Sequence, residues 1–291
     1  DAILLVGTNP RWEAPLVNTR LRKAVRRGAK AYAIGPEVDL TYAVEWLGDD
    51  LSLLSKLPET FAKAERPVMI VGPGALAAGG QGAALAAASS FIKDGWNGFN
   101  VLHTAASRMA GLVLGYAQRD GIAGIVAAKP SLVILLGADE VPADTFKGAF
   151  TVYIGHHGDK GAASADLVLP GAAYAEKHGT FVNIEGRVQR SERATFPPGD
   201  AREDWTILRA LSDLIGNPLP FDRFDQLRAA MIADTPALGQ YGIGNFDCSP
   251  PKLAAKASGP VSYPIKDFYL TNAICRASPT MRRCSEELVH G

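Results

Sequence analysis

The stretch SADLVLPGAAYAEKHGTFVNIEGRVQR, from Ser164 to Arg190, decides how the rest of the chain is interpreted. Asp166–Leu169 is an apolar run closed by Pro170-Gly171, which predicts a buried strand that enters a turn. Residues 172–177 are predicted to form one or two helical turns. Residues 180–182 are predicted to form a second short extended segment, so the stretch alternates strand and turn as an α/β protein does.

Polar side chains gather in the turns of this stretch. They are Glu176, Lys177, His178, Asn183, Glu185 and Arg187. Open α/β sheets keep their ligands at loops beyond the strand ends. We therefore expect these groups to mark the place where a ligand would bind, or once bound.

Length and composition describe an ordinary globular protein. At 291 residues the chain is long enough for two domains, with 47% apolar and 21% charged residues. Lys plus Arg equals Asp plus Glu, at 30 each, so nothing indicates nucleic acid or a membrane surface as a partner. The best apolar candidate span, residues 121–141, is interrupted by charged residues and proline, so we expect no direct membrane insertion.

The three cysteines, Cys248, Cys275 and Cys284, are odd in number and form no CxxC pair. This pattern disfavours a disulfide framework and is typical of a reducing compartment. It also disfavours an iron–sulfur site, which usually needs four thiolates with several in a tight run. We expect no metal site.

The chain begins at Asp1 without methionine or signal peptide, and we expect it to be a piece of a longer protein whose missing part lies upstream.

The first 35 residues predict a βαβ unit. Ala2–Val6 reads as a strand covered on both faces, Pro15–Arg27 as an amphipathic helix and Ala29–Ile34 as the next strand. Such units form right-handed crossovers. Further strands are predicted, and the last three of them should form a second parallel sheet: residues 68–71, 131–136, 150–154 and 167–169. The segment 131–136 reads as the clearest buried strand.

The sequence Gly72-Pro-Gly-Ala-Leu-Ala77 follows a predicted strand and opens an alanine-rich helix predicted to reach Ile92. G-x-G-x-x-A is a variant of the dinucleotide fingerprint. Against that interpretation, Pro73 removes a backbone donor, and no strand ending in Asp or Glu follows about 20 residues later. We favour close helix–sheet packing and keep a nucleotide site as the alternative.

The pair His156-His157 invites a metal interpretation, but adjacent side chains are expected to point apart and no further ligand stands nearby in sequence. We favour a structural loop. Ser164 lacks the G-x-S-x-G elbow of a nucleophile, and no catalytic residues are predicted.

The last third of the chain predicts helices at residues 202–215 and 224–232, an irregular segment at 235–262 and a final helix that ends near residue 289. The expected organisation is a first Rossmann-like lobe at residues 1–110, a second at 111–216, and at 217–291 a C-terminal extension that wraps the surface.

Residues 166–189 resemble the late segment of the molybdopterin oxidoreductase superfamily, in which an "AD..LP...W.E..GTF.N.EGR.Q" pattern lies beside the pterin. Residues 4–10, with Pro15 and then Gly28-Ala-Lys30, resemble its "GxNP…P…GAK" unit. The resemblance implies an α/β fold of two Rossmann-like, doubly wound lobes, as in formate dehydrogenase, with an irregular C-terminal extension.

The tail DFYLTNAICRASPTMRRC (267–284) and the segment WNGFNVLHTAASRMA (96–110) resemble the large iron–sulfur subunits of respiratory complex I, NADH:quinone oxidoreductase. That resemblance implies a structural, non-catalytic part of an enzyme complex, inactive alone, that carries electrons from NADH to quinone through [2Fe-2S] and [4Fe-4S] clusters in the missing N-terminal region. It implies other peripheral-arm subunits as partners. It also implies a peripheral location on the cytoplasmic side of the bacterial inner membrane or the mitochondrial matrix side.

Carried over residue by residue, the superfamily pattern marks a vestigial cofactor groove at Gly7, Asn9, Pro10, His178, Gly179, Asn183 and Arg187. We expect these positions to bind no cofactor. Only Arg11 stands near Gly7–Pro10 to hold phosphates, which weakens the case for a pterin dinucleotide. The alternative is a fragment of a molybdopterin-dependent oxidoreductase that still binds the pterin.

Overall fold

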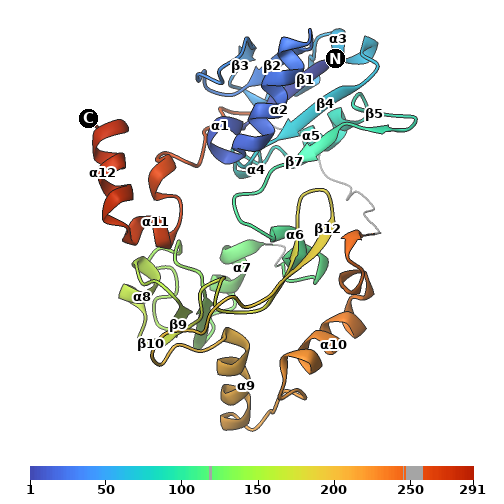
Figure 1. Cartoon of the computed structure of the whole chain (residues 1–291). Helices are drawn as coiled ribbons and strands as arrows, with labels where there is room; N and C mark the ends of the chain where they lie inside the picture. Colours follow the sequence, from blue (N-terminus) through green and yellow to red (C-terminus); the bar gives the residue numbers. More distant parts are fainter. Residues whose placement is uncertain (118–119, 245, 247–257) are drawn as a thin grey trace. The chain divides into compact units, whose positions relative to one another are not determined.

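The computed structural model describes residues 1–117, 120–244, 246 and 258–291, which belong to two compact units (Figure 1). The first unit comprises residues 1–106 and 247–268, and the second comprises residues 107–246 and 269–291. The residues after 216 are thus divided between the two units. The expected domains 1–110, 111–216 and 217–291 stay a prediction about how the chain is organised.

The first unit is built on a five-stranded parallel sheet with the strand order β3-β2-β1-β4-β7. The predicted βαβ unit is confirmed, because β1 and β2 pair in parallel from Ala2–Lys30 to Val6–Ile34. The elements of this unit are β1 (Ala2–Val6), α1 (Pro10–Glu13), α2 (Pro15–Arg26), β2 (Lys30–Ile34), β3 (Glu45–Gly48), η1 (Leu51–Ser55), α3 (Thr60–Lys63), β4 (Pro67–Val71), α4 (Pro73–Ala77), α5 (Gln81–Ala88), β5 (Ile92–Lys93), β6 (Trp96–Asn97) and β7 (Phe99–Val101).

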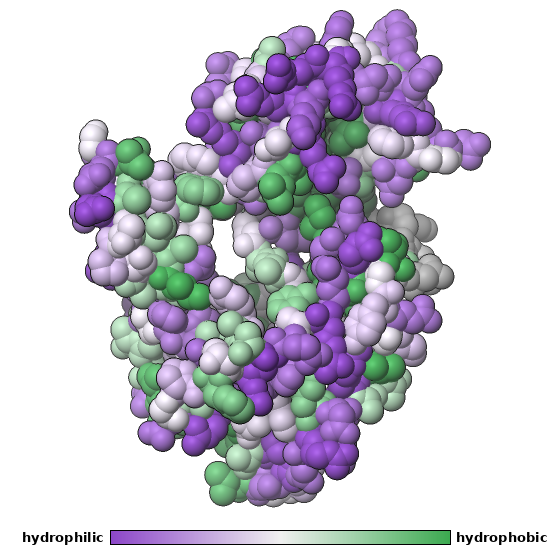
Figure 2. All heavy atoms as spheres, in the orientation of Figure 1, coloured by the Kyte–Doolittle hydropathy of each residue, from purple (hydrophilic) through white to green (hydrophobic). Residues whose placement is uncertain are grey.

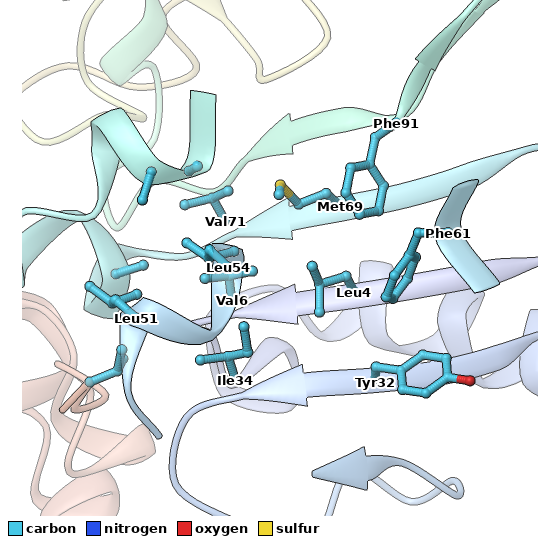
Figure 3. Packing of buried hydrophobic residues seen from close by; sticks show 14 of the residues in the cluster. Leu4, Val6, Tyr32, Ile34, Leu51, Leu54, Phe61, Met69, Val71 and Phe91 are labelled. Carbon is cyan, nitrogen blue, oxygen red and sulfur yellow. The ribbon is translucent and has the colours of Figure 1, made fainter. Parts of the chain in front are cut away.

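Both faces of this sheet are covered, as the continuous apolar run of β1 predicts. Leu4 and Val6 point to one face and join a buried cluster that includes Phe61 and Phe91 (Figure 3). Ile3 and Leu5 point to the other face and pack in a second cluster with residues of α2. Side chains alternate along a strand, so one apolar run supplies both clusters.

The predicted alanine-rich helix to Ile92 is wrong in its extent. The chain forms two helices, α4 and α5, separated by a turn in which Gly79 has a φ of +76°. Gly80 donates its N–H to the carbonyl of Ala75 at 2.8 Å, which closes α4. Glycine readily takes this left-handed conformation, and it ends the helix despite the high helix propensity of the alanines.

The second unit contains the predicted second parallel sheet, in the order β10-β9-β8. The expectation that residues 131–136 and 166–169 are buried strands is wrong as regards burial. Leu132 on β8 is 48% exposed and Val168 on β10 is 48% exposed. With three strands, β8 and β10 are both edges, and the buried side chains of this sheet are those of Leu135 on β8 and of residues 152–154 on β9.

An antiparallel sheet of order β11-β12-β13 and several helices complete the second unit. Its elements are α6 (Arg108–Val113), α7 (Gly121–Ala127), β8 (Leu132–Leu136), β9 (Phe150–Gly155), α8 (Lys160–Ser164), β10 (Leu167–Pro170), β11 (Gly179–Val182), β12 (Arg187–Ser191), α9 (Asp204–Leu214), α10 (Phe224–Asp234), η2 (Pro236–Gly239), β13 (Gly242–Ile243), α11 (Ala273–Ala277) and α12 (Pro279–Leu288), with η3 (Phe268–Leu270) where the chain passes from one unit to the other. Apolar residues stand among hydrophilic ones on the face seen in Figure 2, and Leu214 at the end of α9 is 85% exposed.

The helical turns predicted at residues 172–177 are wrong, because this segment forms turns without a helix. The Glu176 carboxylate accepts the N–H of Ala173 at 2.9 Å, and the Glu176 N–H donates to the Ala173 carbonyl at 2.9 Å. This reciprocal pair closes the turn locally. A side chain that bonds the nearby backbone offers the chain an alternative to the helix.

Candidate functional site

Three glycines bring the loops at the carboxyl ends of β1 and β4 into close contact. Gly7 has a φ of +58°, and a Cβ at Gly7 would lie closer than 3.0 Å to Ala75. A Cβ at Gly72 would meet Thr8 as closely, and one at Gly74 would meet the carbonyl of Ser262. The chain's own atoms therefore occupy the space that a dinucleotide's phosphates would need. These contacts account for the fingerprint-like glycines as packing residues.

Residues 258–266, which we call the closing strap, lie over this edge of the first sheet. Val261 donates its N–H to the carbonyl of Asp49 at 2.9 Å and is 3% exposed. Tyr263, 8% exposed, donates its hydroxyl to the carbonyl of Pro36 at 2.8 Å, and burial raises its pKa. The ring of Tyr263 also packs on Gly35, just after β2. The strap thus covers the side of the sheet where α/β proteins bind ligands.

Asn9 and Pro10, two of the predicted groove residues, are buried beside the strap. The Asn9 carbonyl accepts the N–H groups of Trp12 and Glu13, at 3.0 and 2.9 Å, which starts α1. Asn9 Oδ1 and Glu13 Oε1 are buried and have no hydrogen-bond partner among the described residues. Burial raises the pKa of Glu13, and the hydrogen bond that Thr8 donates to its carboxylate opposes that shift.

A cavity of about 370 Å³ lies at this place in the first unit. Its lining residues are Asn9, Arg11, Trp12, Val38, Asp39, Tyr263, Ile265 and Lys266. The Arg11 guanidinium is held by the carboxylate of Asp39 at 2.7 Å. The basic group that sequence considerations placed near an ancestral phosphate site is therefore already neutralised by an acid of the same unit.

The other four predicted groove residues lie together around the β11–β12 hairpin of the second unit. Asn183 Oδ1 accepts the N–H groups of Glu185 and Arg187, both at 3.0 Å. Gly186 in the same turn has a φ of +77°. The Arg187 side chain lies 3.6 Å from the Glu185 carboxylate. Asn183 thus shapes the turn through its backbone contacts, as asparagine commonly does.

His178 stands just before β11, at the other end of the hairpin. Its Nδ1 lies 2.7 Å from the carboxylate of Glu192 and 3.3 Å from the backbone nitrogen of Arg193. The imidazole ring stacks on Phe224 with 4.9 Å between ring centroids. The structure therefore groups Gly7, Asn9 and Pro10 at one strand end and His178, Gly179, Asn183 and Arg187 around one hairpin, in different compact units.

The expectation that His156 and His157 point apart is wrong. Their Nδ1 atoms are 2.8 Å apart and the ring centroids 5.0 Å apart. Burial, followed by the neighbouring His157, lowers the pKa of His156. Within the described part of the chain, no group of three or more His, Cys, Asp or Glu side chains is placed to hold a metal ion.

Sequence reasoning missed an ion cluster at the carboxyl edge of the second parallel sheet. Asp139, 2% exposed, accepts the N–H of Gly161 at 2.9 Å with one oxygen and Arg276 at 2.9 Å with the other. Arg276, on α11, also pairs with Asp159. No spacing rule links residues 139 and 276. The tail of the chain thus contributes a cation to the strand end where a ligand would bind.

The molybdopterin pattern implies a pterin dinucleotide, and the described residues do not fit one. Such a ligand carries phosphates that need free cationic or backbone donors at open strand ends. In the first unit the strand ends hold Val261 and Tyr263 of the strap, and Arg11 is paired with Asp39. In the second unit Arg276 is committed to Asp139 and Asp159.

Two cysteines, Cys275 and Cys284, are free and half-buried, and Cys248 lies outside the described residues. No helix in the described ranges is both long enough and apolar enough to cross a membrane.

Comparison with known families divides the chain in two. The model for molybdopterin oxidoreductase matches residues 1–214, and the model for the NADH-ubiquinone oxidoreductase G C-terminal domain matches residues 247–284.

Individual relatives agree with both matches. The mitochondrial NADH-ubiquinone oxidoreductase 78 kDa subunit of Neurospora crassa is 45% identical, over 98% of this chain and 41% of that protein. The NADH-ubiquinone oxidoreductase 75 kDa subunit of Reclinomonas americana is 39% identical, over 98% of this chain and 44% of that protein. The mitochondrial 78 kDa subunit of Candida albicans is 40% identical, over 98% of this chain and 42% of that protein. The chain thus spans less than half the length of the curated relatives it matches. With a family model matching it from residue 1 to residue 214, the chain belongs to the molybdopterin oxidoreductase family.

Proposed function

We propose that this chain is a structural, non-catalytic part of the large iron–sulfur subunit of NADH:quinone oxidoreductase. One observation carries the proposal: the C-terminal part of the chain closes the ligand edge of each parallel sheet. Tyr263 does so in the first unit and Arg276 in the second. Cofactor enzymes with such sheets keep these edges open. A chain that fills them with its own side chains keeps the fold for its shape.

The wider assignment rests on the relatives, whose names are those of NADH-ubiquinone oxidoreductase subunits. Electron transfer from NADH to quinone is then carried by [2Fe-2S] and [4Fe-4S] clusters in a region N-terminal to this one. The partners are other subunits of the peripheral arm. The chain lies on the cytoplasmic side of the bacterial inner membrane or on the matrix side in mitochondria, attached through those partners.

The groove positions Gly7, Asn9, Pro10, His178, Gly179, Asn183 and Arg187 are, in this proposal, remnants that bind no cofactor. The alternative is that the chain still binds a pterin. One observation favours it: the buried Asn9 Oδ1 and Glu13 Oε1 have no partner among the described residues, so a donor from a ligand would satisfy them.

The test uses the whole subunit assembled in its complex. Tyr263→Ala and Arg276→Ala should lower the amount of assembled complex on native gels, while NADH:quinone turnover per assembled complex stays unchanged. Arg187→Ala should change neither, and Arg283→Ala, on the exposed side of α12, is the matched control. Turnover per complex that falls at a constant amount of complex would contradict the structural role. Stoichiometric molybdenum and an oxidised pterin fluorophore in the purified complex would establish the alternative.

A further inference from the structure

A second cavity lies within the second unit, between β11, α9 and α10, with a volume of about 500 Å³. This volume is in the range of small-molecule sites. Its apolar wall is formed by six side chains: Leu114, Leu136, Leu208, Phe224, Leu227 and Met231. Such a wall favours the binding of a hydrocarbon group and disfavours small ions that have no hydrocarbon part.

Most charged groups around this cavity already have partners of opposite sign. Lys177 forms an ion pair with Asp204. Glu203 accepts a hydrogen bond from Arg193 at 3.0 Å and another from the indole of Trp205 at 3.1 Å. The opposite charges within each pair cancel, so neither pair offers a net charge to a ligand.

Arg228 on α10 is the exception. Its Nη1 donates to the hydroxyl of Thr180 at 3.1 Å and its Nη2 to the hydroxyl of Tyr241 at 2.7 Å, and both partners are neutral. No carboxylate in the described ranges forms an ion pair with it. Its guanidinium lies 5.3 Å from the centre of the Tyr241 ring and is held in place by these contacts. A half-buried, positioned cation thus borders an apolar cavity without a counter-charge.

We propose that this cavity binds an amphipathic carboxylate, with its hydrocarbon part against Leu208, Phe224 and Leu227 and its carboxylate on Arg228. A guanidinium pairs with a carboxylate through two parallel hydrogen bonds, and such charge-assisted bonds are the strong ones. The apolar wall accommodates a medium-length acyl chain. The cavity reaches the carboxyl end of β8 at Leu136 and the groove positions His178 and Gly179, but neither Tyr263 nor Arg276 lines it, so the proposal does not rest on the structural role proposed above.

Calorimetric titration of the chain with sodium decanoate, below its micelle concentration, tests the proposal. Decanoate should bind once per chain, and decanol and decyltrimethylammonium at least tenfold more weakly. Arg228→Gln should weaken decanoate about tenfold and leave decanol unchanged, because only the charged contact is lost. Arg223→Gln is the matched control, since Arg223 is exposed, pairs with Asp225 and does not line the cavity. It should leave decanoate binding unchanged.

Two further measurements locate the ligand. Leu208→Trp fills the cavity and should abolish binding, provided that circular dichroism shows the variant folded. Independently of that variant, a dibrominated decanoate should quench the fluorescence of Trp205, which lines the cavity, and Trp205→Phe should remove that part of the quenching. Absence of saturable binding, equal loss in the Arg228 and Arg223 variants, decanol binding as tightly as decanoate, or quenching that survives in Trp205→Phe would each overturn the proposal.

Discussion

Arg276 donates through Nη2 to Oδ2 of Asp139 at 2.9 Å, although 137 positions separate the two residues in the chain. The aspartate is 2% exposed and the arginine side chain 23% exposed, so the pair fixes a tail helix to the buried end of a strand. Asp159 holds the same guanidinium from the other side. The pair is a specific attachment of the C-terminal tail to the second unit.

Arg276→Ala should lower the free energy of unfolding by about 2–4 kcal/mol, because it leaves the buried Asp139 carboxylate with only the Gly161 hydrogen bond. Urea unfolding followed by circular dichroism measures this change. Arg283→Ala on α12 removes an exposed pair with Glu287 and should stay within about 0.5 kcal/mol of the unmodified chain. Equal effects of the two substitutions would mean that the Asp139 pair contributes no more than a surface contact.

Gly74→Ala and Gly111→Ala should change stability in opposite directions, although both glycines lie in helices. A Cβ at Gly111 meets nothing within 4 Å, so alanine should stabilise the chain by about 0.5–1 kcal/mol through helix propensity. A Cβ at Gly74 would lie closer than 3.0 Å to the carbonyl of Ser262, and the overpacking should cost about 2 kcal/mol or more. Thermal unfolding of both variants decides this. If Gly74→Ala were stabilising, the strap would not be packed against α4 as described.

Tyr263→Phe should cost about 1 kcal/mol, because the Pro36 carbonyl loses its hydroxyl donor. Tyr263→Ala should cost about 3–5 kcal/mol, since it also removes a buried ring. Tyr174, 68% exposed, provides the control: Tyr174→Phe should change the free energy of unfolding by less than about 0.5 kcal/mol. The prediction fails if the two Phe variants unfold at the same urea concentration.

Glu13 should make the first unit less stable as the pH rises. Burial raises its pKa above the ordinary value of 4.5, so the folded chain holds this proton more tightly than the unfolded chain does. The contribution of Glu13 to the free energy of unfolding is therefore fully present below pH 4.5, and it is lost as the pH rises through the raised pKa of the folded chain. Glu13→Gln should remove this loss.

The free energy of unfolding of Glu13→Gln minus that of the unmodified chain should thus be larger at pH 7.5 than at pH 4. Taking this difference cancels the opposite trend of carboxylates such as Asp50, whose pKa is lowered by its contacts with Ser52. A pH-independent difference would show that Glu13 is ordinarily solvated.

The strands of the chain could be predicted from sequence more reliably than their surroundings. The apolar run Ala2–Val6 predicted both ends of β1 correctly, because a strand that is covered on both faces is apolar at every position. The apolar runs at β8 and β10 also predicted strands correctly, but they did not predict how exposed the side chains of those strands are. An apolar strand at the edge of a small sheet has the same sequence pattern as a central one.

The candidate site was less predictable because it depends on distant pairs. Nothing in the local sequence around Asp139 indicates Arg276, and nothing around Gly74 indicates Ser262. The histidine pair was misjudged for another reason: side chains alternate in a strand, but His156 and His157 follow β9 in a bend, where that rule does not hold.

Tyr263 and Arg276 leave the ribosome after every strand whose end they cover. Domains begin to fold while the chain is still being made, so both sheets pass through the later part of translation with uncovered ends. A chain that ends before residue 263 lacks both side chains, so the carboxyl ends of the strands stay uncovered in both sheets. A truncated chain would therefore expose two sheet ends that the contacts of Tyr263 and Arg276 cover in the longer one.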